Sequence, residues 1–151
     1  MKNTIITVAC FVMAVSAFAQ KISEKDLLGK WEISFVNIEG TTIDFETGTI
    51  TIAPGAAEAE GITEADLKSR ITTAMGTKAD SFVLFSEGSQ LLISIRGQED
   101  VKGQYTITER GGQPFITHGG IEYRADLKDG KLNLTMPAGE GVEVAMRFKK
   151  V

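Results

Sequence analysis

A single histidine and three pairs of acidic residues are the side chains in this sequence with the most evident chemical potential. His118 is the only histidine of the 151-residue chain, so any imidazole-based catalysis or metal binding would depend on it. The sequence contains no glycine-rich phosphate loop, zinc-ligand spacing, calcium loop or nucleophile-elbow motif. We therefore predict no enzymatic activity, no cofactor and no metal site.

The acidic pairs have a structural interpretation. Two neighbouring carboxyl groups can act as general acid and base. All three pairs lie in or beside predicted turns, where charge keeps a loop solvated, and we interpret them as surface residues. The pairs are Glu58 with Glu60, Glu99 with Asp100, and Glu140 with Glu143.

His118 stands immediately before a Gly119-Gly120 turn. A two-residue turn at these glycines would pair His118 with Ile121 and Ile116 with Tyr123, and would turn the histidine inward near Tyr105. In that register His118 and Tyr105 could be the polar anchors of an apolar cavity. The alternative is a histidine at an exposed strand end.

Aromatic side chains either line a pocket or fill the interior of the protein. The interior of a barrel of about eight strands can be closed by side chains alone. The sequence is compatible with both a pocket and a filled core. If a pocket exists, the candidate ligand-binding residues are Phe82, Tyr105, His118 and Tyr123.

The first nineteen residues have the pattern of a secretory signal peptide. Lys2 precedes an apolar run at residues 5–15, and Ala17-Phe18-Ala19 has the small-x-small pattern of a cleavage site. The run is shorter than the roughly 20 residues that span a bilayer. We predict cleavage after Ala19, a periplasmic or secreted location and no stable membrane anchor.

Residues 20–151 have the length of a single domain. Without Lys2, 15 of the 16 basic residues and all 20 acidic residues remain, which gives a net charge of −5, and no cysteine remains. A hydrophobic core must therefore stabilise the domain without disulfides. An acidic chain without a basic cluster also argues against nucleic acid as a partner.

Apolar and polar residues alternate between short turn sequences, which is typical of antiparallel strands. A two-residue turn fixes which residues face each other. At Asp129-Gly130 it pairs residue 127 with 132 and 125 with 134, all four of them apolar. The same rule predicts Phe45 opposite Ile50 at Thr47-Gly48, and Phe82 opposite Ile93 with Leu84 opposite Leu91 at Glu87-Gly88.

The first strand needs an irregularity. A turn at Glu39-Gly40 would bring Val36 against Ile43, whereas Trp31 and Ile33 have the opposite parity, so we predict a bulge near Phe35. From Trp31 to the C-terminus the pattern predicts an all-β, up-and-down antiparallel barrel of about 8–10 strands.

One α-helix is predicted to interrupt the strands, at about residues 63–75. Thr63 is a suitable N-cap with Asp66 three residues later, and Gly76 is a suitable C-cap. The apolar stripe along the helix indicates a lid over a barrel mouth or a cap on one end of a core. The preceding segment "APGAAEAEG", residues 53–61, is interpreted as a mobile connection.

The segment "LLGKW", residues 27–31, resembles the Gly-x-Trp motif with which lipocalins and their calycin relatives begin their first strand. The resemblance implies that an N-terminal turn covers the closed end of a barrel. It also implies that a basic side chain from the last strand packs over Trp31. The sequence "VEVAMRFKK" offers Arg147 for this latch, as a cation–π partner of Trp31.

The segments "FVLFSEGSQLLISI", "GQYTIT" and "IEYRADLKDGKLNLTM" also resemble the small exported lipocalin-like domains of Bacteroidetes-type bacteria. The inserted helix departs from a simple lipocalin. The calycin-like entry, the closed meander and the absence of a catalytic set lead to the hypothesis of a non-enzymatic exported lipocalin-like protein that binds a small, partly apolar ligand, with the helix and residues 53–61 gating one end. That hypothesis predicts a connected internal cavity.

An alternative hypothesis is a protein-interaction module, such as a periplasmic inhibitor with a filled barrel core. Some protease inhibitors resemble the same Gly-x-Trp barrel and act through an exposed N-terminal arm. A large exposed apolar patch would favour this class. An enzyme that uses His118 or an unrecognised carboxylate pair is the third class.

Overall fold

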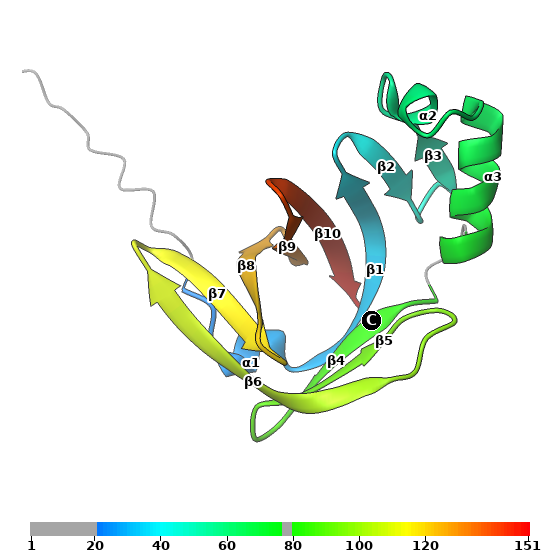
Figure 1. Cartoon of the computed structure of the whole chain (residues 1–151). Helices are drawn as coiled ribbons and strands as arrows, with labels where there is room; N and C mark the ends of the chain where they lie inside the picture. The colour runs from blue at the N-terminus through cyan, green and yellow to red at the C-terminus, as the bar shows by residue number, and fades with distance from the viewer. Residues whose placement is uncertain (1–20, 77–79) are drawn as a thin grey trace, which may run out of the picture.

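The computed structural model describes residues 21–76 and 80–151, so the predicted signal peptide at residues 1–19 lies outside the described part of the chain. Within it, ten strands and three helices follow one another in the order shown in Figure 1. They are α1 (Glu24–Leu27), β1 (Gly29–Ile38), β2 (Thr41–Asp44), β3 (Thr49–Thr51), α2 (Ala56–Ala59), α3 (Glu64–Met75), β4 (Phe82–Ser86), β5 (Gln90–Ser94), β6 (Val101–Arg110), β7 (Gln113–His118), β8 (Ile121–Lys128), β9 (Lys131–Gly139) and β10 (Val142–Lys150).

Eight of these strands close into an antiparallel barrel. The sheet order is β10-β9-β8-β7-β6-β5-β4-β1-β2-β3, and β10 also pairs with β1. The barrel therefore comprises β1 and β4 to β10, with β2 and β3 as an extension from β1. From β4 to β10 each strand pairs with its neighbour in sequence, which is the up-and-down architecture of lipocalin-like barrels. The predicted fold class is confirmed.

Strand β1 changes partner halfway along its length. Its first residues, Gly29–Glu32, pair with β4, and its last residues, Phe35–Ile38, pair with β2. Ile33 N–H donates to the carbonyl of Ser81 beside β4, whereas the Ser34 carbonyl accepts from the N–H of Phe45 after β2, both at 3.0 Å. The sheet forks at this point.

A β-bulge coincides with the fork and confirms the predicted irregularity. The register of β1 against β10 shifts between Ile33 and Phe35, so Ser34 is the extra residue. Its buried hydroxyl donates to the carbonyl of Arg147 at 3.2 Å. The bulge changes the parity of inward positions, and Ile33 and Val36 are both buried as a result.

The registers predicted in the C-terminal half are confirmed. The Asp129-Gly130 hairpin opposes Leu127 to Leu132 and Ala125 to Leu134. The Gly119-Gly120 hairpin pairs residue 118 with 121 and residue 116 with 123. In the N-terminal half, the register predicted at the Glu39-Gly40 turn is also confirmed, because Val36 lies opposite Ile43.

Two predicted registers are wrong because their loops are longer than two residues. Ile43, not Phe45, pairs with Ile50, and residues 45–48 form the loop. The carboxylate of Asp44 accepts hydrogen bonds from the N–H groups of Glu46 and Thr47 and so favours the longer turn.

The β4–β5 loop has three residues, because Ser89 adopts a left-handed conformation with φ +56° and pairing resumes at Gln90. Phe82 consequently lies opposite Ser94 and Leu84 opposite Leu92. The inward residues at this hairpin are Val83, Phe85, Leu91 and Ile93.

Helix α1 plugs one end of the barrel (Figure 1). Ser23 and Asp26 form a capping box at its start, and their hydrogen bonds lower the pKa of Asp26. Leu27 is fully buried, and its carbonyl accepts a 2.6 Å hydrogen bond from the indole N–H of Trp31. The Gly-x-Trp motif thus attaches the N-terminal turn to the first strand.

The predicted latch between Trp31 and Arg147 is wrong. Lys150 lies over Trp31, with its Nζ 5.2 Å from the centroid of the ring, and the two residues are paired across β1 and β10. Arg147 pairs with Phe35 and lies 5.1 Å from the centroid of that ring. A basic residue of the last strand does cover the tryptophan, but it is three positions later than predicted.

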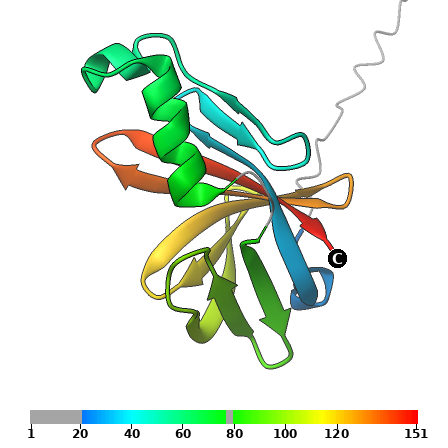
Figure 2. The same cartoon turned by 90° about the vertical axis from the view of Figure 1, so that its right-hand side faces the viewer.

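Helix α3 confirms the predicted inserted helix. Thr63 is its N-cap and accepts from the N–H of Asp66, and Gly76 is its C-cap. The helix lies beside the β2–β3 hairpin, at the end of the barrel opposite α1 (Figure 2). Segment 53–61, interpreted from the sequence as a mobile connection, contains the short helix α2.

Truncation of Leu27 tests the role of the α1 plug. Leu27→Ala should lower the free energy of unfolding by about 2–5 kcal/mol, because it opens a cavity beneath Trp31 in a fully buried site. Lys25→Ala, at an exposed position of the same helix, should change it by less than about 0.5 kcal/mol. Urea unfolding of residues 20–151 measures both, and equal effects would contradict the plug.

Candidate functional site

The barrel contains a cavity of about 430 Å³. Its inner wall comes from the barrel strands, and Ala74 and Met75 at the end of α3 also line it. Several lining residues, such as Ile38, Ile95 and Gln98, are exposed to solvent, so the cavity opens at the α3 end of the barrel. The connected cavity expected of a ligand-binding barrel is therefore present.

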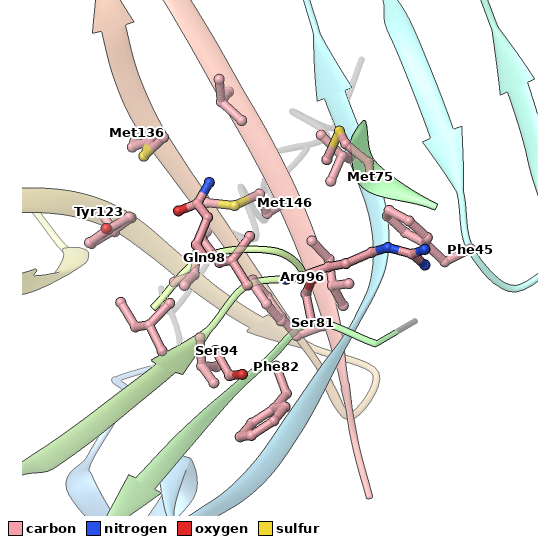
Figure 3. A pocket seen from close by; sticks show the side chains of 18 of the residues that line it. Phe45, Met75, Ser81, Phe82, Ser94, Arg96, Gln98, Tyr123, Met136 and Met146 are labelled. Carbon is pink, nitrogen blue, oxygen red and sulfur yellow. Dashed lines mark hydrogen bonds between the residues drawn. The ribbon is translucent and has the colours of Figure 1, made fainter. Parts of the chain in front are cut away.

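Apolar side chains form the body of the cavity. Its deeper part is formed by buried residues of several strands, and three methionines, Met75, Met136 and Met146, contribute flexible thioether side chains (Figure 3). The buried lining residues are Ile33, Val36, Phe45, Val83, Phe85, Leu91, Ile116, Leu134, Val144 and Phe148. Such a surface favours an apolar molecule.

Few polar residues border the cavity. Among the described lining residues they are Ser81, Ser94, Arg96, Gln98 and Tyr123, and Arg96 is the only charged one. Ser81, Ser94, Arg96 and Gln98 come from the segments at the start of β4 and the end of β5. Polar contacts are thus available mainly on one side of the mouth.

Two of the four predicted ligand-binding residues border the cavity. Tyr123, on β8, is partly buried, and burial raises the pKa of its phenol. Phe82 pairs with Glu32 of β1, and the Nζ of Lys30 lies 4.5 Å from the centroid of the Phe82 ring. Its ring therefore lies on the outer face of the barrel, and in Figure 3 it points away from Gln98.

The other two predicted residues lie deeper, outside the set that lines the cavity. Tyr105 and His118 form a cross-strand pair of β6 and β7 and are 2% and 6% exposed, so of the two alternatives for His118 the inward position is confirmed and the exposed strand end is wrong. The Tyr105 ring packs edge-on against Phe85, with centroids 5.1 Å apart. The pair belongs to the packed core near the closed end.

His118 is held by its Nδ1, which donates to the carbonyl of Gln104 at 3.0 Å. Gly103 makes room for the imidazole, because a Cβ at that position would lie 2.8 Å from Cε1 of His118. The buried Nε2 of His118 and the hydroxyl of Tyr105 have no hydrogen-bond partner among the described residues. Burial raises the pKa of the Tyr105 phenol, and the negative charge of Glu24 raises it further.

The acidic pairs lie away from the cavity. All six residues are exposed, and none of them lines it. Within residues 21–76 and 80–151, no group of three or more acidic, histidine or cysteine residues is placed to hold a metal ion. None of the helices in these ranges combines the length and apolar character needed to cross a membrane.

Sequence reasoning missed the methionines and Arg96. Met136 and Met146 occupy inward positions of β9 and β10, and the alternation of residues indicates this orientation, but it does not indicate whether their side chains line a cavity or fill the core. Arg96 follows β5 in a turn, where residue alternation gives no orientation.

No known protein family and no curated protein matches the sequence. Among solved structures, a secretory abundant heat soluble protein of Ramazzottius varieornatus is 19% identical, with 83% of this chain and 96% of that chain covered and a TM-score of 0.43. The zebrafish ileal bile acid-binding protein, complexed with cholic acid, is 17% identical over 83% of this chain and 99% of that chain, with a TM-score of 0.38.

A third solved structure is the REP1-NXSQ fatty acid transporter, 15% identical over 84% of this chain and 97% of that chain, with a TM-score of 0.39. These TM-scores and identities are too low to support an inference about the ligand of this chain. The fold is established by its own topology.

The two tyrosines, the only ones in the chain, should titrate above the ordinary tyrosine pKa of 10.0. The folded protein then keeps phenol protons that the unfolded chain loses, so its stability should fall as the pH rises above about 10. Phenolate absorbance of the Tyr105→Phe and Tyr123→Phe variants measures each remaining group separately. A titration at the ordinary value in either variant would contradict the burial of that phenol.

Proposed function

We propose that this chain is an exported, non-enzymatic barrel protein that binds a small, predominantly apolar ligand inside the barrel. The cavity of about 430 Å³ is the observation that carries the proposal. Its volume lies within the range of about 300–1,000 Å³ that is typical of ligand pockets, and a mainly apolar lining with few polar groups is typical as well.

The lining explains why an apolar ligand would bind. Transfer of apolar surface from water into the barrel contributes about 25 cal/mol per Å². The methionines near the mouth can adapt to ligand shape because their side chains are unbranched and polarisable. Binding of this kind needs no specific reacting group.

The same lining favours a binding protein over an enzyme. The described residues that line the cavity include no histidine or carboxylate that could act as a general base for Ser81 or Ser94, and the carboxylate of Asp80 beside the mouth is engaged by Arg96. His118 lies outside the cavity, and its Nδ1 is engaged by a backbone carbonyl.

An inhibitor that acts through a free N-terminal arm is not favoured. Ile22 and Leu27 are buried, so the chain from Ile22 onward packs against the barrel. Within the described residues, this packing argues against the exposed arm on which the alternative hypothesis depends.

Export rests on the pattern of residues 1–19 alone. The protein isolated from its own host should have the intact mass of residues 20–151 and should be recovered outside the cytoplasm. An Ala19→Arg variant should retain the first nineteen residues, because signal peptidase requires a small residue at the cleavage site. A wild-type protein that keeps residues 1–19 would contradict export by cleavage.

A neutral apolar probe tests binding inside the barrel. N-phenyl-1-naphthylamine should gain fluorescence with residues 20–151, and Met136→Trp should weaken its binding by about tenfold or more, because the indole occupies the cavity. The matched control is Ile121→Trp, at a position that is 46% exposed and does not line the cavity. Absent binding, or equal effects of the two variants, would contradict the proposal.

A further inference from the structure

We infer that the ligand is an anionic amphiphile, with an apolar chain in the barrel and a negatively charged head group at Arg96. This inference rests on the proposed function and names the chemical class of ligand that the same cavity takes. The head group is a carboxylate or another oxyanion, because a guanidinium recognises these groups through charge-assisted hydrogen bonds.

The charge of the cavity lining selects the sign of the head group. Arg96 is the only charged residue among the described residues that line the cavity, and no carboxylate lines it. A cationic ligand would therefore be repelled by the guanidinium, whereas an anionic ligand can compete with the exposed carboxylate of Asp80 for it. A fully apolar ligand would make no use of Arg96.

The surrounding structure fixes the position of Arg96. Its backbone N–H donates to the hydroxyl of Ser81 at 3.1 Å, and its Nη1 donates to Oδ2 of Asp80 at 2.8 Å. Gly76 at the end of α3 allows the guanidinium to approach, because a Cβ there would lie 2.5 Å from Nη1. Cations are favoured at helix C-termini, so the end of α3 also stabilises the charge.

The guanidinium has donors to offer beyond this ion pair. It carries five N–H groups, and one hydrogen bond, to Asp80, is formed among the described residues. The Arg96–Asp80 pair is 47% and 43% exposed, and exposed pairs of this kind are weak. A head group can therefore bind to the other donors or replace Asp80.

The location of Arg96 also suits an amphiphile. Its side chain extends toward Phe45, and Met75 and Gln98 also line the cavity (Figure 3). A head group there remains partly hydrated, which avoids the desolvation cost of a deeply buried ion pair. The apolar chain can then extend between Ile116 and Phe148 in the interior.

The test compares two ligands of equal chain length that differ in charge, dodecanoate and 1-dodecanol, each below its aggregation limit. Calorimetric titration of residues 20–151 should show that Arg96→Gln weakens dodecanoate binding by about tenfold and changes 1-dodecanol binding by less than about threefold. Arg96→Lys should retain most of the dodecanoate affinity because it retains the charge. Arg70→Gln, on the exposed surface of α3 and outside the cavity lining, should change neither.

The outcomes separate this inference from the proposed function. If both ligands bind and Arg96→Gln affects them equally, or affects neither, the anionic head-group site is wrong while the apolar cavity still binds ligand. If neither ligand binds to the wild-type protein, both proposals are overturned. If dodecanoate alone is weakened, and Arg96→Lys restores it, Arg96 is the head-group site.

Discussion

The barrel depends on the way in which one strand, β1, uses its two edges. One edge pairs with β10 and closes the barrel, and the other is divided between β4 and β2. The parity of the inward-facing residues changes along β1, from Trp31 and Ile33 before the fork to Val36 after it, and the bulge at Ser34 supplies that shift. The hydroxyl of Ser34 donates to a carbonyl of β10, so the buried side chain at the fork has a hydrogen-bond partner.

The fork also explains why one end of the barrel is filled and the other is hollow. Below it, the α1 plug, Trp31 and the pair of Phe85 with Tyr105 occupy the interior with large rings in contact. Above it, β1 pairs with β2 instead of β4, and the side chains at the mouth include exposed isoleucines, methionines and the polar residues around Arg96. A filled core and a lined cavity, which the sequence left as alternatives, coexist in one barrel.

Sequence reasoning predicted elements well wherever turn chemistry and alternation were sufficient. Asp129-Gly130 and Gly119-Gly120 close two-residue turns, so their registers followed directly, and with them the inward position of His118. It failed where a loop was lengthened by a feature that a turn dipeptide does not reveal: the side-chain acceptor Asp44 and the left-handed Ser89. Similarly, the identity of the cation over Trp31 depends on the register between β1 and β10, which are distant in sequence. The presence of the cavity depends on how completely the side chains fill the barrel, and a pattern of residue types does not give this.

The division of β1 has an evolutionary consequence. Barrel closure uses the β1–β10 and β1–β4 ladders, and the segment from β2 through α3 contributes no strand to the closed ring. This segment leaves the ring after β1 and returns to it at β4, on the same side of the barrel mouth. The hydrogen-bonded ring therefore does not depend on the length of this segment, whereas the core does depend on its buried residues Ile43 and Phe45. Selection can thus change the exposed parts of the segment, and with them the entrance to the barrel, while the ring that closes the barrel stays the same.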